Sequence, residues 1–163
     1  MKNPDIIQQK IYSLPELLKQ VTRWKFLKKK IAFSNGCFDI LHEGHIFSLS
    51  QAAKEGDVLV VGINADASTK RLKGPSRPVN TEHSRALLIA SLVMTDAVVI
   101  FEEDTPFELI SAIMPDTIVK GGDYTVEQVV GAKEVIANGG KVVINPIIHG
   151  FSTTSIIEKI HNL

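Results

Sequence analysis

The most informative stretch of the sequence is residues 30–45, Lys-Ile-Ala-Phe-Ser-Asn-Gly-Cys-Phe-Asp-Ile-Leu-His-Glu-Gly-His. Its apolar run, Ile31–Phe33, predicts a buried strand. The dipeptide Asn35-Gly36 predicts where that strand ends, because both residue types tolerate left-handed backbone. From Ile46 onward, apolar residues recur three and four positions apart, which predicts a helix. The two histidines that end the stretch therefore lie where a strand passes to a helix N-terminus.

The histidines of this turn indicate an anion site. His42 and His45 are three residues apart, a spacing that puts both on one helical face. A helix N-terminus adds free N–H groups and a favourable dipole. Gly44, between the histidines, lets another group approach the backbone closely. We therefore favour a polyphosphate site over two helix-start residues that are merely polar.

Composition describes an ordinary globular chain. It has 163 residues, of which 44% are hydrophobic and 22% are charged, enough for one sizeable core. Lys plus Arg and Asp plus Glu are 18 each, so net charge does not favour nucleic acid or an anionic membrane as a partner. The only cysteine, Cys37, rules out an intrachain disulfide, and the other histidines lie too far along the chain to suggest zinc ligands. No apolar run reaches membrane-spanning length, so we expect a cytoplasmic protein.

Strands and helices alternate after residue 30. We expect strands at 31–34, 57–63, 97–101, 117–120 and 141–144, and helices at about 44–55, 81–94, 105–114, 126–138 and from 152. Residues 64–80 are expected to form a polar and basic loop. Continuous apolar strands between amphipathic helices predict an α/β fold with a doubly wound, five-stranded parallel sheet of Rossmann-like type. Residues 1–29 are expected to be an N-terminal helical extension to a domain at 30–163.

Ligands of such sheets bind beyond the carboxyl ends of the strands, and four polar segments follow those ends. These segments are Asn35 to His45, the basic run with Lys73, Lys120 to Tyr124, and Ser152 to Thr154. No nucleophile with a base and an orienting acid stands out, so covalent catalysis is not expected. The residues instead suit positioning and electrostatic stabilisation, which is how proteins promote phosphoryl and nucleotidyl transfer.

The phrase at 35–45 resembles the signature of the cytidylyltransferase-like nucleotidyltransferases, whose mark is a His-x-Gly-His turn. Further segments extend the likeness over about residues 31–160 to the family of adenylyltransferases that form ADP-heptose, like the C-terminal domain of bifunctional heptose kinase/adenylyltransferases. These segments are Asn64-Ala-Asp66, Ala67 to Gly74, Ser76 to Val79, Phe101 to Pro106, Val119 to Tyr124, Lys133 to Val135, Ala137 to Gly140 and Ser152 to Thr154. The resemblance implies the HxGH type of nucleotidyltransferase fold.

The resemblance also implies a reaction. AMP would pass from ATP, accompanied by Mg²⁺, to D-glycero-β-D-manno-heptose 1-phosphate, giving ADP-heptose and pyrophosphate for lipopolysaccharide core synthesis. A separate heptose kinase would supply the sugar phosphate. The implied catalytic residues are His42, His45 and Lys73. The implied nucleotide-binding residues are Asn35, Gly36, Phe38, Asp39, Gly44, Lys120, Gly121, Gly122, Asp123, Ser152, Thr153 and Thr154.

Alternatives and open points remain. A cytidylyltransferase acting on glycerol 3-phosphate or a similar alcohol phosphate is the near alternative, but related enzymes carry an arginine and an acid where this chain has Ile147, Ile148 and His149. A non-catalytic nucleotide-binding module is a second alternative. A dinucleotide-dependent dehydrogenase is a third, and it lacks its Gly-x-Gly-x-x-Gly after the first strand. Metal ligands, the roles of Arg85 and His149, and a homo-oligomeric state stay open.

Overall fold

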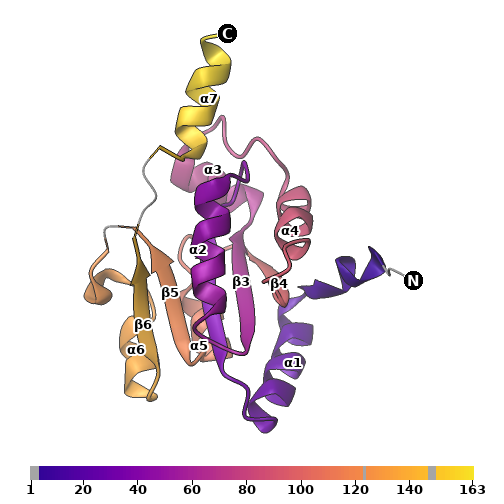
Figure 1. The fold of residues 1–163 in the computed structure, drawn as a ribbon, viewed down its shortest axis with the longest axis vertical. Coiled ribbons are helices and arrows are strands. Elements are labelled where there is room, and N and C mark those ends of the chain that lie inside the picture. Colours follow the sequence, from indigo (N-terminus) through magenta and orange to yellow (C-terminus); the bar gives the residue numbers. More distant parts are fainter. Residues whose placement is uncertain (1–3, 123, 147–149) are drawn as a thin grey trace.

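A six-stranded parallel sheet forms the centre of the molecule (Figure 1). The computed structural model describes residues 4–122, 124–146 and 150–163. Along the sheet the strand order is β1-β4-β3-β2-β5-β6. The strands are β1 (Ile11–Tyr12), β2 (Ile31–Gly36), β3 (Val58–Asn64), β4 (Ala97–Phe101), β5 (Thr117–Gly121) and β6 (Lys141–Asn145).

Helices cover both faces of this sheet. The α-helices are α1 (Leu14–Phe26), α2 (Glu43–Ala53), α3 (Asp66–Lys73), α4 (Glu82–Ala90), α5 (Phe107–Ile113), α6 (Ala132–Ala137) and α7 (Thr153–His161). The described residues also form three short 3₁₀ helices, η1 (Pro4–Ile6), η2 (Gln8–Lys10) and η3 (Val126–Gln128). Helices α1, α5 and α6 contribute to one buried apolar cluster and α2 and α4 to a second, so the sheet lies between two cores.

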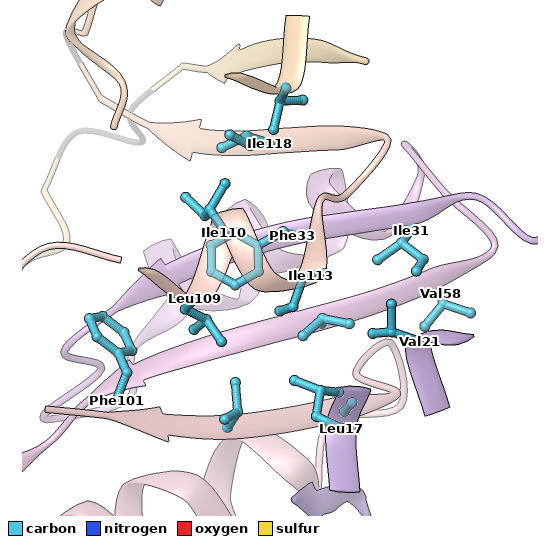
Figure 2. Packing of buried hydrophobic residues seen from close by; sticks show 14 of the residues in the cluster. Leu17, Val21, Ile31, Phe33, Val58, Phe101, Leu109, Ile110, Ile113 and Ile118 are labelled. Carbon is cyan, nitrogen blue, oxygen red and sulfur yellow. The ribbon is translucent and has the colours of Figure 1, made fainter. Parts of the chain in front are cut away.

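The two cores explain why the central strands are apolar on both faces. Every residue of β3 is buried, as expected for a strand covered on both sides. In Figure 2, Leu109, Ile110 and Ile113 of α5 lie over Phe33 of β2, and α1 adds Leu17. Burying a large apolar side chain of this kind contributes about 1.5–3 kcal/mol.

Local sequence explains where several helices begin. Ser13 and Glu16 form a reciprocal capping box at the start of α1, with Pro15 in its first turn. Ser152 accepts a hydrogen bond from the N–H of Ser155 at the start of α7, at 3.0 Å. Both helix starts were predicted from these residues, because a serine oxygen satisfies an N–H that has no partner inside the helix.

The parallel Rossmann-like sheet is confirmed, but the prediction of five strands is wrong. The sixth strand is β1, where Ile11 pairs with Val98 and Tyr12 with Val99 of β4. A strand of two residues is too short to show an alternating hydrophobic pattern, so it could not be predicted from the sequence. It forms because it pairs with the distant strand β4. The same α1 that follows it places Leu17 and Val21 in the first core. The division of the chain at residue 29 stays a prediction.

Two further expectations differ from the structure. The presumed loop at 64–80 contains helix α3, whose first turn carries Asp66 and whose last turn carries three cations. The acid at the N-terminus and the cations at the C-terminus interact favourably with the helix dipole. This charge pattern favours a helix, but the polar composition of the segment led us to predict a loop. The strand predicted to stop before Asn35-Gly36 continues through both residues. The left-handed residue of this turn is Phe38, with φ +48°.

Helices long and apolar enough to cross a membrane are absent from the described part of the chain.

Candidate active site

The polar segments meet above the carboxyl ends of β2 and β5. These neighbouring strands are the point where the chain order of the sheet reverses, which is where doubly wound sheets bind ligands. A cavity of about 570 Å³ opens there, and a second of about 300 Å³ adjoins it. The larger cavity is lined by these predicted site residues: Asn35, Gly36, Phe38, Asp39, His42, His45, Lys73, Lys120, Ser152, Thr153 and Thr154. Gly44, Gly121 and Gly122 line the second, and Asp123 and His149 lie outside the described residues.

The two histidines of the turn form a stacked pair. Their ring centroids lie 3.7 Å apart at an interplanar angle of 22°. His42 is the N-cap residue of α2, and His45 lies in its first turn. Both Nδ1 atoms are buried without a hydrogen-bond partner among the described residues, so Nε2 is the ring nitrogen available to a ligand. Buried polar atoms are normally satisfied, so two unpaired Nδ1 atoms in neighbouring rings are an exception.

Gly44 and Phe38 fix the positions of these rings. A Cβ atom on Gly44 would lie 3.1 Å from Cε1 and Nδ1 of His42, so a larger residue there would force that ring to move. Phe38 packs edge-on against His45, with ring centroids 5.2 Å apart at 69°. The left-handed backbone of Phe38 is unfavourable for a bulky residue, and such strain is found mainly at functional sites. Packing therefore holds the pair in one orientation before any ligand arrives.

Burial keeps both imidazoles neutral at neutral pH. Loss of solvation lowers the pKa of His42. Loss of solvation, followed by repulsion from His42, lowers the pKa of His45 to about 4. A neutral imidazole donates one hydrogen bond and accepts another, so the two rings would bind a ligand through hydrogen bonds and not through a full positive charge. An anion bound beside the pair would favour the protonated form and raise both pKa values.

Two lysines reach the same cavity, one from helix α3 and one from strand β5. Lys73 ends α3, beside Gly74 with φ +99°, and its side chain is exposed. Lys120, in β5, is half-buried, and its Nζ donates a hydrogen bond to Asn35 Oδ1 at 3.4 Å. Burial, and to a lesser extent repulsion from Lys73, lowers the pKa of Lys120, while Cys37 acts in the opposite direction. Two ammonium groups that repel each other across a cavity provide a site for an anion.

Asp39 links the histidine turn to the basic segment after α3. Its side chain is 1% exposed, and Oδ2 accepts a hydrogen bond from Nε of Arg77 at 2.5 Å. Its Oδ1 accepts from the N–H groups of Val79 and Asn80, at 2.8 and 2.9 Å. The side-chain amide of Asn80 donates to the carbonyl oxygen of Asp39 at 2.7 Å. Both carboxylate oxygens are thus occupied by the protein, and Arg77, which was not predicted as a site residue, lines the cavity.

Arg85 is a second residue that sequence reasoning left without a role. It is fully buried on α4 and donates hydrogen bonds to the carbonyl oxygens of Cys37 and Asn80, at 2.6 and 3.0 Å. Its Nη2 pairs with Asp66 at 2.7 Å. Arg85 therefore ties the histidine turn to α3 and α4. The sequence pattern that could have indicated this role is an arginine on the apolar face of an amphipathic helix, beside Ala86 and Ile89.

The described residues contain no group of three or more His, Cys, Asp or Glu side chains placed to hold a metal ion. In the cavity wall, Asp39 is occupied as above, and Asp104 pairs with Arg71 at 2.7 Å. This donor set fits a hard cation that arrives on a phosphate ligand and keeps most of its water.

The model of one known family matches most of the chain. The "Cytidylyltransferase-like" family model matches residues 33–159, a span that contains the stacked histidines and both lysines. The chain belongs to the cytidylyltransferase-like family. Its resemblance to that family at residues 35–45 is thereby confirmed.

This family member is similar to several curated proteins named "Bifunctional protein HldE". It is 54% identical to that of Koribacter versatilis over 156 residues, covering 96% of this chain and 32% of the relative. It is 53% identical to that of Hyphomonas neptunium, covering 88% of this chain and 29% of the relative. The chain thus spans about a third of the length of these relatives.

Solved structures agree with the family. A lipopolysaccharide core biosynthesis protein from Thermoplasma volcanium is 32% identical with a TM-score of 0.59, over 74% of this chain and 97% of that protein. Pantothenate synthetase from Thermus thermophilus has a TM-score of 0.61 at 17% identity, covering 90% of this chain and 67% of that one. The second likeness shows the shared fold alone.

Proposed function

We propose that this protein transfers AMP from ATP to D-glycero-β-D-manno-heptose 1-phosphate, giving ADP-heptose and pyrophosphate. The observation that carries the proposal is the stacked pair His42 and His45, which lines the same cavity as Lys73 and Lys120. A polyphosphate supplies the anionic acceptors that these groups lack. The resemblance to the ADP-heptose-forming adenylyltransferases of the HxGH type selects the nucleotide and the sugar.

The reaction requires little acid–base chemistry from the protein. An oxygen of the heptose phosphate attacks the α-phosphorus of ATP. The bond from that phosphorus to the oxygen bridging to the β-phosphate breaks, and pyrophosphate leaves with the electron pair. A phosphate monoester is already mainly ionised at neutral pH, so the nucleophile needs no general base. Neutral histidines therefore suit the task, which is to position the reactants and stabilise charge.

Each segment then has a role. Nε2 of His42 and of His45 donates to oxygens of the α- and β-phosphates. Lys73 neutralises charge that gathers on the leaving pyrophosphate. The N-terminus of α7, with its N-cap Ser152 and the residues Thr153 and Thr154, offers backbone N–H groups and hydroxyls to the same phosphates. Gly121 and Gly122 place bare backbone beside the nucleoside, and the Asn35–Asp39 turn forms the phosphate cradle.

Mg²⁺ would accompany ATP by coordinating its phosphate oxygens and water, in keeping with the few carboxylates that the cavity offers. When bound, it would neutralise charge on the β- and γ-phosphates. The residues that orient those phosphates against it are the histidine pair and the start of α7.

The proposal extends to the setting of the reaction. The product would serve lipopolysaccharide core synthesis, in keeping with the name of the Thermoplasma volcanium neighbour. A heptose kinase would act before this protein, since the acceptor must already carry a phosphate at its anomeric carbon. We place the reaction in the cytoplasm, where ATP is available, and the chemistry in residues 30–163.

A pyrophosphate-release assay tests the proposal. The purified chain is incubated with ATP or CTP, each with heptose 1-phosphate or glycerol 3-phosphate, and the His42→Asn/His45→Asn double variant serves as a folded control. We expect pyrophosphate only with ATP and the heptose phosphate, and a loss of at least about 100-fold in the control. Release with CTP and glycerol 3-phosphate would overturn the assignment in favour of the alcohol-phosphate cytidylyltransferase. Nucleotide binding without release from any pair would indicate a non-catalytic module.

A further inference from the structure

The candidate site consists of two lobes that share one wall. The smaller cavity alone is lined by Ser48, Gly121, Gly122 and Pro146, and the larger alone by Lys73, Arg77 and Thr105 among others. Both cavities share His42, His45 and Lys120. A ligand that extends from one lobe into the other must therefore pass the histidine pair, where the reacting phosphorus would lie.

We propose that the larger lobe takes the sugar phosphate and that Arg77 binds its phosphate group. This inference rests on the proposed function, because it assigns the second substrate of that reaction to one lobe. With the nucleoside in the smaller lobe against the bare backbone of Gly121 and Gly122, the larger lobe holds the phosphates of ATP beside Lys73 and leaves room for the acceptor beside Arg77.

The structure holds the Arg77 guanidinium in a fixed place. Its Nε donates to Asp39 Oδ2 at 2.5 Å, and the two side chains are 14% and 1% exposed. Asp39 is itself held by the N–H groups of Val79 and Asn80, so the guanidinium is anchored to a saturated carboxylate. Fixing a charged group in this way lowers the entropy that a substrate must lose on binding.

Most of the donors of Arg77 remain unused. A guanidinium has five N–H groups, of which the one on Nε goes to Asp39. No described residue accepts a hydrogen bond from Nη1 or Nη2, yet Arg77 lines the larger lobe. A planar fork of N–H groups matches two oxygens of a phosphate. The cavity therefore presents a preorganised bidentate phosphate site.

Charge balance favours the acceptor as the ligand of this site. The proposed triphosphate contacts already engage His42, His45, Lys73 and the start of α7. A sugar phosphate brings its own negative charge and needs a cation of its own to enter a site that already holds ATP. Among the described residues, Lys73, Arg77 and Lys120 are the cations that line the larger lobe, and Lys120 belongs to the shared wall. Arg77 is the one that remains.

Substrate-specific kinetics test this assignment. We expect Arg77→Gln to raise the KM for heptose 1-phosphate about 10- to 100-fold, because a charge-assisted bidentate contact is lost. The Kd of ATP, measured by calorimetry, should stay within about threefold. Arg77→Lys should recover only part of the affinity, since a point charge does not replace a fork. Asp39→Asn, which frees Arg77 without removing it, should raise the same KM.

Arg71 provides a matched control. Its Nε donates to Asp104 Oδ1 at 2.7 Å in the way that Arg77 donates to Asp39, but Arg71 is half-exposed and does not line the cavity. Arg71→Gln should change the KM for the sugar phosphate less than about threefold. Equal effects of Arg71→Gln and Arg77→Gln, an unchanged KM in Arg77→Gln, or an equal loss of ATP affinity would each overturn the assignment.

Direct binding separates this inference from the proposed function. Heptose 1-phosphate is titrated into the wild-type protein and into Arg77→Gln, with a non-hydrolysable ATP analogue bound to both. Weaker binding to the folded variant supports the role of Arg77 even if the wild type releases no pyrophosphate, a result that would count against the proposed function alone. Equal binding to both proteins would overturn the role of Arg77.

Discussion

The lowered pKa of His45 predicts that the folded protein loses stability as the pH falls below neutrality. Burial, assisted by the neighbouring His42, lowers this pKa from 6.5 to about 4. In the unfolded chain the ring returns to its ordinary value near 6.5. Between these two values the unfolded state binds more protons at His45 than the folded state does. The stability that the neutral ring allows is therefore present above about pH 6.5 and is lost as the pH falls toward 4.

The size of the effect follows from the same two values. One pKa unit corresponds to about 1.4 kcal/mol, so the difference between 6.5 and about 4 sets an upper limit of about 3 kcal/mol. At about pH 5 the folded ring is still mostly neutral while the unfolded ring is almost fully protonated, which makes the expected loss about 2 kcal/mol. A loss of this size is a large part of the net stability of a domain.

Urea unfolding at about pH 7.5 and about pH 5, in a buffer without phosphate, measures this loss. We expect the free energy of unfolding of the wild type to fall about 2 kcal/mol further than that of His45→Gln over this interval. His83→Gln, at an exposed histidine of α4, should keep the wild-type pH dependence. If His45→Gln loses as much stability as the wild type, burial of His45 does not control its protonation and the reasoning is refuted.

Further predictions concern the chemistry. His42→Ala and His45→Ala should each lower kcat about 100- to 1000-fold with unchanged circular dichroism, and near-native turnover in both would remove the histidines from the mechanism. Lys73→Ala should lower kcat strongly and leave the KM for the sugar phosphate nearly unchanged, as expected of a contact made mainly in the transition state. Lys70→Ala is its control on the same helix, and equal losses that vanish at high salt would reduce Lys73 to part of a diffuse basic surface. Gly44→Ala should displace the His42 ring, which lies 3.1 Å from the position of the added Cβ, and lower kcat about tenfold or more while the Tm changes little. A large fall in Tm would show that the glycine serves folding instead.

The sequence alone determined the features that depend on neighbouring residues. Continuous apolar runs predicted β2, β3, β4, β5 and β6, because a strand covered on both faces needs apolar residues throughout. The histidine turn was predicted at the joint of a strand and a helix, and the structure stacks its two rings at that joint. The parallel topology then brought the polar segments to one edge of the sheet, since every parallel strand has its carboxyl end on the same side.

Features that depend on distant partners appeared only in the tertiary structure. Strand β1 exists because Ile11 and Tyr12 pair with Val98 and Val99, some 87 positions later in the chain. Arg77 was one member of a basic segment until the fold brought it to Asp39, 38 residues away. Arg85 likewise gained its role from contact with Cys37 and Asp66.

Backbone strain and the solvation of side chains also depend on the tertiary structure. The left-handed backbone of Phe38 has no local signal, because nothing in a phenylalanine favours that conformation and tertiary contacts of the turn, among them the packing of Phe38 against His45, hold it there. The pKa of His45 depends on how much water the folded chain removes from its ring. Periodicity and turn chemistry act over a few residues and can be read along the chain, whereas ion pairs, desolvation and strain arise only when folding brings separate segments together.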